Sequence, residues 1–187
     1  MHGIDYDAAF ERVTGHRPFK WQRRLHAALV DGATPATVDL PTGLGKTSVM
    51  AIWLIALAGG ASLPRRLIYV VDRRTVVDQA SETARRLRDA LDAELAAALG
   101  LSGRRLAIST LRGGLAGDRS WMEDPAAPAI VIGTVDMIGS RLLFEGYGVS
   151  RAARPMAAAL LGCDAMLLLD EAHLATPLLA TARAAAA

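Results

Sequence analysis

The sequence predicts an α/β domain whose mostly parallel sheet carries helices on both faces. Short apolar runs alternate with longer helical segments, which is the order that parallel strands with crossover helices require. The run at residues 67–71 is apolar throughout, as expected of a strand buried on both faces. A chain of 187 residues is long enough for one such domain and a short arm.

Each expected element has its own signal. Residues 5–13 and 21–30 are predicted as helices separated by a turn that contains Gly15 and Pro18. One long helix is expected over residues 75–99, because leucine recurs every four residues from Leu87 to Leu99. Residues 112–128 are rich in glycine and proline, and no element is assigned there. The remaining predictions are helices at about 46–58 and 136–144, and strands at 36–40, 67–71, 106–109, 130–132 and 166–169.

These elements are grouped into three parts. Residues 1–32 are expected to form a helical arm, residues 33–181 the main domain, and residues 182–187 a low-complexity tail outside the fold.

Composition excludes several classes of protein. Hydrophobic residues make up 52% and charged residues 21%, which excludes a disordered chain. The single cysteine, Cys163, excludes an internal disulfide framework and fits a reducing compartment. The net charge of +2 permits nucleic-acid binding without indicating it. No leader pattern is present, and the apolar stretch at 49–61 is shorter than the roughly 20 residues of a membrane span, so a cytoplasmic protein without a membrane partner is expected.

The strongest chemical signal is the segment Pro-Thr-Gly-Leu-Gly-Lys-Thr, which lies between an expected strand and an apolar helix. Gly43 and Gly45 allow backbone N–H groups to approach phosphate oxygens, and the helix N-terminus adds positive potential. Lys46 would reach the β- and γ-phosphates, and the Thr47 hydroxyl would bind Mg²⁺. The alternative is a glycine-rich turn with a solvated lysine. The predicted ATP-binding residues here are Thr42, Gly43, Leu44, Gly45, Lys46, Thr47 and Ser48.

A second signal is the tetrapeptide Asp-Glu-Ala-His directly after an apolar strand. The strand would deliver Asp170 to the carboxyl edge of the sheet, where open α/β sheets bind ligands. Asp170 would hold Mg²⁺ through its water shell, and Glu171 would orient or deprotonate the attacking water. His173 is expected to relay the nucleotide state rather than bind the metal. Taken alone, Asp170 could instead be a helix N-cap.

Together the two motifs resemble those of superfamily 2 helicases and translocases, which implies a RecA-like lobe that binds ATP and Mg²⁺. In that light the segment around Trp21 and Gln22 resembles the Q motif. The resemblance implies that Gln22 pairs with adenine through its side-chain amide and that Phe19 or Arg17 covers the ring. The alternative for Gln22 is a surface residue of an amphipathic helix.

The same resemblance implies contacts with nucleic acid in the loops that follow successive strands. Such contacts go to phosphates, and they position a strand without reading its sequence. The plain alternatives are a capped helix start at Thr75, a mobile turn, and a strand-to-helix loop. The candidate residues are Arg73, Arg74, Thr75, Arg112, Gly113, Gly114, Thr134 and Asp136.

A closer resemblance covers residues 10–177. The chain is similar to the CRISPR-associated helicase–nuclease of type I interference systems, in five runs at residues 19–22, 38–47, 69–79, 133–143 and 167–173. Residues 140–148, Ser-Arg-Leu-Leu-Phe-Glu-Gly-Tyr-Gly, also resemble that family without a chemical reason of their own.

This resemblance implies ATP-driven movement on single-stranded DNA, delivered by a guide-RNA surveillance complex. It also implies a second RecA-like lobe and a nuclease module, neither of which the sequence contains, so the chain is expected to be the N-terminal part of a longer protein. Two alternatives stay open. One is another superfamily 2 motor, either an RNA helicase or a restriction-type translocase, and the other is a non-motor scaffold lobe that binds ATP.

Overall fold

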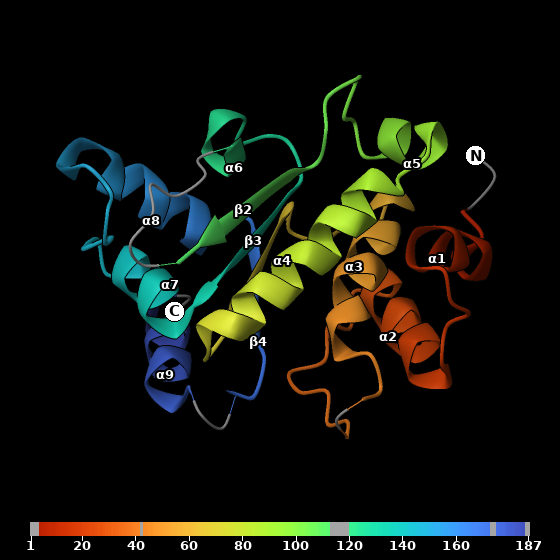
Figure 1. The fold of residues 1–187 in the computed structure, drawn as a ribbon, viewed down its shortest axis with the longest axis horizontal. Coiled ribbons are helices and arrows are strands. Elements are labelled where there is room, and N and C mark those ends of the chain that lie inside the picture. Colours follow the sequence, from red (N-terminus) through yellow and green to blue (C-terminus); the bar gives the residue numbers. More distant parts are fainter. Residues whose placement is uncertain (1–3, 42, 113–119, 173–174, 186–187) are drawn as a thin grey trace. The chain divides into compact units, whose positions relative to one another are not determined.

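The computed structural model describes residues 4–41, 43–112, 120–172 and 175–185. The chain divides into two compact units. The first comprises Met1–Leu63 and Thr83–Arg105, and the second comprises Pro64–Glu82 and Leu106–Ala187. The two units are described separately below, and Figure 1 labels their elements.

The second unit contains a four-stranded, all-parallel sheet (Figure 1). Its strands are β1 (Arg66–Val71), β2 (Ala107–Leu111), β3 (Ala129–Thr134) and β4 (Ala165–Leu169), in the order β2-β3-β1-β4. Each overlaps a predicted strand. All six residues of β1 and of β3 are buried, which explains why both are apolar except for Arg66 at the start of β1 and Thr134 at the end of β3. Because the strands are parallel, their carboxyl ends lie along one edge of the sheet.

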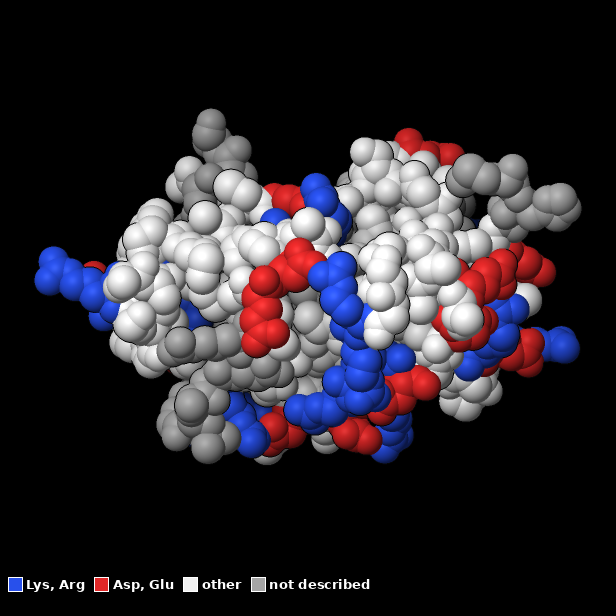
Figure 2. All heavy atoms as spheres, turned by 90° about the horizontal axis from the view of Figure 1, so that it is seen from above, with Lys and Arg blue, Asp and Glu red and all other residues white. Residues whose placement is uncertain are grey.

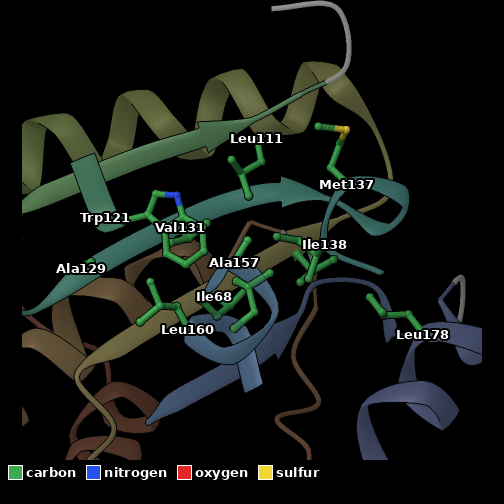
Figure 3. Packing of buried hydrophobic residues seen from close by; sticks show 12 residues of the cluster. Ile68, Leu111, Trp121, Ala129, Val131, Met137, Ile138, Ala157, Leu160 and Leu178 are labelled. Carbon is green, nitrogen blue, oxygen red and sulfur yellow. The ribbon is translucent and has the colours of Figure 1, made fainter. Parts of the chain in front are cut away.

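One face of this sheet is covered by four helices, α6 (Ser120–Glu123), α7 (Val135–Leu142), α8 (Arg154–Gly162) and α9 (Thr176–Ala185), with the short 3₁₀ helix η2 (Arg151–Ala153) before α8. Trp121 is 2% exposed and packs in one cluster with Val131 and Leu160. Figure 3 shows these side chains on the same side of the sheet, with Ile138 from α7 and Leu178 from α9 beside them.

The opposite face carries α4 (Arg74–Asp89), whose residues 74–82 belong to the second unit. The buried Ser81 of α4 accepts a hydrogen bond from the Thr110 hydroxyl of β2 at 2.9 Å. The predicted fold class, a parallel sheet with helices on both faces, is therefore confirmed for this unit and fits a RecA-like lobe.

The first unit is helical in its described residues and centres on α3 (Val49–Ala58). Residues 49–56 of α3 are all buried, because the helix is apolar on every side. The helices α1 (Tyr6–Thr14), α2 (Lys20–Val30) and α5 (Ala93–Ala98) pack against it. Ion pairs join the surrounding helices: Arg23 of α2 binds Asp7 of α1, and Arg12 of α1 binds Asp92, which caps α5.

Two predictions of local structure are wrong. Residues 36–40 form neither strand nor helix, and Val38 is 44% exposed. This segment pairs with no strand in the part of the chain that the structure describes, and an extended segment without a ladder gains nothing from β propensity. The single helix expected at 75–99 is broken after Asp89, because the Asp92 side chain accepts from the Leu95 N–H and starts a new helix.

The sequence does not predict α6, α8 and α9. In α6 only four residues are helical, too few for a periodic pattern, and Trp121 anchors them. In α8 the sequence Pro-Met-Ala-Ala-Ala-Leu-Leu is apolar with little periodicity. Among the described residues, no helix has both the length and the apolar character needed to cross a membrane.

Candidate nucleotide site

The predicted phosphate-binding loop lies in the first unit and has the backbone that its glycines permit. Gly43 and Gly45 have φ values of 87° and 70°, in the left-handed region that glycine adopts at no steric cost. The chain then passes through the 3₁₀ helix η1 (Lys46–Ser48) into α3. Lys46, Thr47 and Ser48 are half-buried. A glycine turn that leads into a helix N-terminus is an anion-binding arrangement. Thr42 lies outside the described residues.

Helix α2 holds this loop from one side through two side chains. The indole Nε1 of Trp21 donates to the Leu44 carbonyl at 3.2 Å. Gln22 is 3% exposed, and its Nε2 donates to the Ser48 Oγ at 2.6 Å. The Ser48 hydroxyl in turn donates to the Gly45 carbonyl at 2.7 Å. Sequence reasoning assigned no role to Trp21, because a tryptophan at a helix start carries no signal of its own.

The Gln22 amide is engaged at both ends in this structure. Its Oε1 accepts from the Phe19 N–H at 2.7 Å, while its Nε2 holds Ser48. Phe19 is 53% exposed, and the Arg17 side chain is 84% exposed and near Glu11. The predicted pairing of Gln22 with adenine therefore requires the amide to exchange one of these partners for the base, and it stays a prediction.

In the second unit, Asp170 stands one residue beyond the end of β4, at the carboxyl edge of the sheet. Its N–H donates to the Val70 carbonyl at 2.9 Å, which extends the β1–β4 ladder by one residue. Its Oδ2 accepts from the Tyr69 hydroxyl at 3.0 Å. Asp170 lies in the turn that follows β4. Tyr69 is a residue that sequence reasoning missed; the one signal was a tyrosine in an otherwise aliphatic strand.

Glu171 is exposed and has a φ of 51°. A non-glycine residue in the left-handed region is uncommon, and such strain concentrates at functional sites. The predicted general base therefore has an unusual backbone conformation, directly after the predicted metal ligand in the sequence. His173 lies outside the described residues.

The predicted nucleic-acid contacts of the second unit follow β1, β2 and β3 and so share the carboxyl edge with Asp170. Arg73, Arg74 and Thr75 are exposed where β1 leads into α4. Thr75 lies inside α4, so the expected helix cap at this residue is wrong; the helix already begins at Arg74.

Two of the other candidates, Thr134 and Arg112, have partners within the structure. Thr134 is 8% exposed, and its side chain accepts from the Met137 N–H at 3.4 Å, which caps α7. Asp136 is exposed in the first turn of α7. Arg112 is ion-paired with Asp78 of α4. Gly113 and Gly114 lie outside the described residues.

Figure 2 shows basic side chains in a continuous run on this face, with acidic side chains on both sides of it. The net charge of +2 agrees with this near-balance of the two signs.

The donors available for Mg²⁺ are oxygen atoms. The described residues contain no cluster of three or more histidine, cysteine, aspartate or glutamate side chains that could hold a metal ion. Mg²⁺ keeps several waters and binds through one or two carboxylates plus the substrate phosphates, so a protein cage is not required. In the first unit the Thr47 hydroxyl, and in the second unit the Asp170 carboxylate, are each an oxygen donor of this kind.

Residues 140–148, to which the sequence gives no role, begin in the last turn of α7 and continue as a loop. The buried Arg141 donates to the Tyr147 carbonyl at 3.2 Å and holds the loop. Leu143, Phe144 and Tyr147 are 57–62% exposed, and Phe144 has a φ of 62°. The loop thus presents apolar side chains on a fixed backbone.

Comparison with known proteins gives one family. The family described as "Type III restriction enzyme, res subunit" matches residues 15–183. No curated protein and no solved structure matches the chain.

Proposed function

This chain belongs to the family of the type III restriction enzyme res subunit, and we propose that it is the ATP-binding lobe of a DNA translocase. The family is a group of superfamily 2 helicase-like ATPases, so a helicase-like, nucleotide-using lobe is the general assignment. The proposal adds the substrate, the roles of single residues and the biological setting.

The residue roles follow from the chemistry of phosphoryl transfer, which depends on positioning and charge neutralisation. Lys46 neutralises the β- and γ-phosphates, and Thr47 and Asp170 are the residues that would hold Mg²⁺. That ion, when bound, neutralises the charge that develops on the phosphate oxygens. Glu171, which follows Asp170 directly, accepts a proton from the attacking water.

The observation that carries the proposal is the loop around Gly43 and Gly45, whose backbone turns through the left-handed region and leads into a buried helix. Lys46→Ala tests it. We expect Mg·ATP affinity to fall about 10- to 100-fold, because a hydrogen bond between charged partners contributes about 1.5–3 kcal/mol. Lys20→Ala is the matched control, since Lys20 is exposed at the start of α2 and is the other lysine of the sequence. Equal ATP affinity in both variants would exclude the phosphate-loop assignment.

We further propose that the motor acts on single-stranded DNA in CRISPR interference, with a guide-RNA surveillance complex and a second RecA-like lobe as partners. The five runs of sequence that resemble the type I helicase–nuclease support this setting. A restriction-type translocase is the second candidate, and the family match favours it. Stimulation of the ATPase activity of the full-length protein separates the two candidates. Single-stranded DNA should stimulate a motor of CRISPR interference, and only duplex DNA should stimulate a restriction-type translocase. Stimulation by RNA alone would indicate an RNA helicase.

A further inference from the structure

Tyr69 and Asp170 share one face of the sheet in the second unit. In the β1–β4 register Tyr69 lies opposite Leu168, and side chains two residues apart on a strand point to the same face. Asp170 is therefore the diagonal neighbour of Tyr69, one step toward the carboxyl edge. The 3.0 Å hydrogen bond from the Tyr69 hydroxyl to the Asp170 Oδ2 spans that diagonal.

The Tyr69 hydroxyl is a polar group among aliphatic neighbours. Tyr69 is 1% exposed, and its neighbours on β1 are aliphatic, so a phenylalanine would fill the same volume without a polar atom to satisfy. A buried tyrosine hydroxyl requires a partner, and here that partner includes a carboxylate at the site edge.

We propose that Tyr69 is a positioning residue that holds the Asp170 carboxylate in the orientation that binds the water shell of Mg²⁺. Strand β1 then fixes Asp170 twice, by the Val70 carbonyl on its backbone and by the Tyr69 hydroxyl on Oδ2. With Oδ2 held, Oδ1 is the oxygen that we assign to the metal's water shell. This inference rests on the proposed function, in which Asp170 holds Mg²⁺.

The test measures metal dependence separately from nucleotide affinity. A fluorescent, non-hydrolysable ATP analogue is bound to the full chain, first without Mg²⁺ and then at increasing Mg²⁺, and the half-saturating Mg²⁺ concentration is recorded. The variants are Tyr69→Phe, Asp170→Asn and the double variant. Tyr147→Phe is the matched control, because it removes a tyrosine hydroxyl that is exposed in the same unit.

We expect Tyr69→Phe to raise the half-saturating Mg²⁺ concentration about tenfold. Loss of a residue that hydrogen-bonds to a metal ligand typically lowers metal affinity about 10- to 100-fold, and tenfold is the lower end of that range. The affinity for the ATP analogue without Mg²⁺ should stay within about twofold of the wild-type value. A difference of that size is no larger than the usual deviation from additivity between independent sites. Because Tyr69 acts through Asp170, adding Tyr69→Phe to Asp170→Asn should cause no further loss. Tyr147→Phe should match the wild type.

Other results would overturn the inference in distinguishable ways. An unchanged Mg²⁺ dependence in Tyr69→Phe, while Asp170→Asn loses it, refutes the positioning role alone. An equal loss of affinity with and without Mg²⁺ shows that the tyrosine only supports the fold. If Asp170→Asn itself leaves the Mg²⁺ dependence unchanged, the metal role of Asp170 in the proposed function fails, and the role of Tyr69 fails with it.

Discussion

Arg66, the first residue of β1, offers a quantitative test of how the second unit is held together. It is 3% exposed, and its guanidinium donates to three backbone carbonyls. The Nε group binds the Leu160 oxygen at 2.9 Å, and the two terminal nitrogens bind the Pro125 and Cys163 oxygens at 2.6 and 2.8 Å. Leu160 and Cys163 lie at the C-terminal end of α8, where helix carbonyls lack partners and the helix dipole favours a cation.

The expected loss in Arg66→Met follows from these contacts. Three hydrogen bonds from a charged donor contribute about 4–5 kcal/mol at the lower end of their range. Burial lowers the pKa of Arg66, which reflects the cost of desolvating its charge. Replacement by an apolar residue of similar length recovers about 1–2 kcal/mol of that cost. We therefore expect Arg66→Met to lower the free energy of unfolding by about 3 kcal/mol.

Urea denaturation followed by far-UV circular dichroism measures this loss. With a slope near 3 kcal/mol per molar, the upper end of the range for small proteins, the midpoint should fall by about 1 M. Arg65→Met is the matched control. Its side chain is 52% exposed and binds Asp164 at 2.9 Å, and such a surface pair contributes no more than about 1 kcal/mol. If both variants unfold at the same urea concentration, the capping role of Arg66 is refuted.

Two further predictions concern catalysis and nucleic acid. Glu171→Gln in the full-length protein should keep ATP binding and slow ATP hydrolysis about 100-fold or more, because loss of a general base has an effect of that size. A steady-state ATPase assay measures this, with Glu123→Gln as the control because Glu123 is also exposed. Normal turnover in Glu171→Gln would show that Glu171 is not the general base. The double variant Arg73→Ala/Arg74→Ala should weaken binding to single-stranded DNA and reduce the salt slope by about 0.7 for each lost phosphate contact. The control is Arg85→Ala/Arg86→Ala, because these two arginines are also exposed and lie further along α4. Equal salt slopes in the two double variants would show that Arg73 and Arg74 make no particular contact with phosphate.

Local sequence was sufficient for many of the elements and for the residue types of the candidate site. The four strands of the sheet and the glycine turn before α3 are predicted close to their observed positions, the strands from their apolar runs and the turn from Gly43 and Gly45. The break before α5 was also local, since Asp92 is a standard N-cap, but the leucine spacing concealed it. Residues 36–40 failed for the opposite reason: a strand exists only if another strand accepts its hydrogen bonds.

The sequence by itself determined which residues are the candidates for binding phosphate, holding a metal and accepting a proton, because such chemistry belongs to the side chains and the glycine backbone. Only the tertiary structure decided which groups support them. Tyr69 meets Asp170 across 101 positions of sequence, and Arg66 meets its three carbonyls across 59 to 97. Such contacts are set by strand register and by the return of α8 to the sheet, and no pattern of neighbouring residues encodes them.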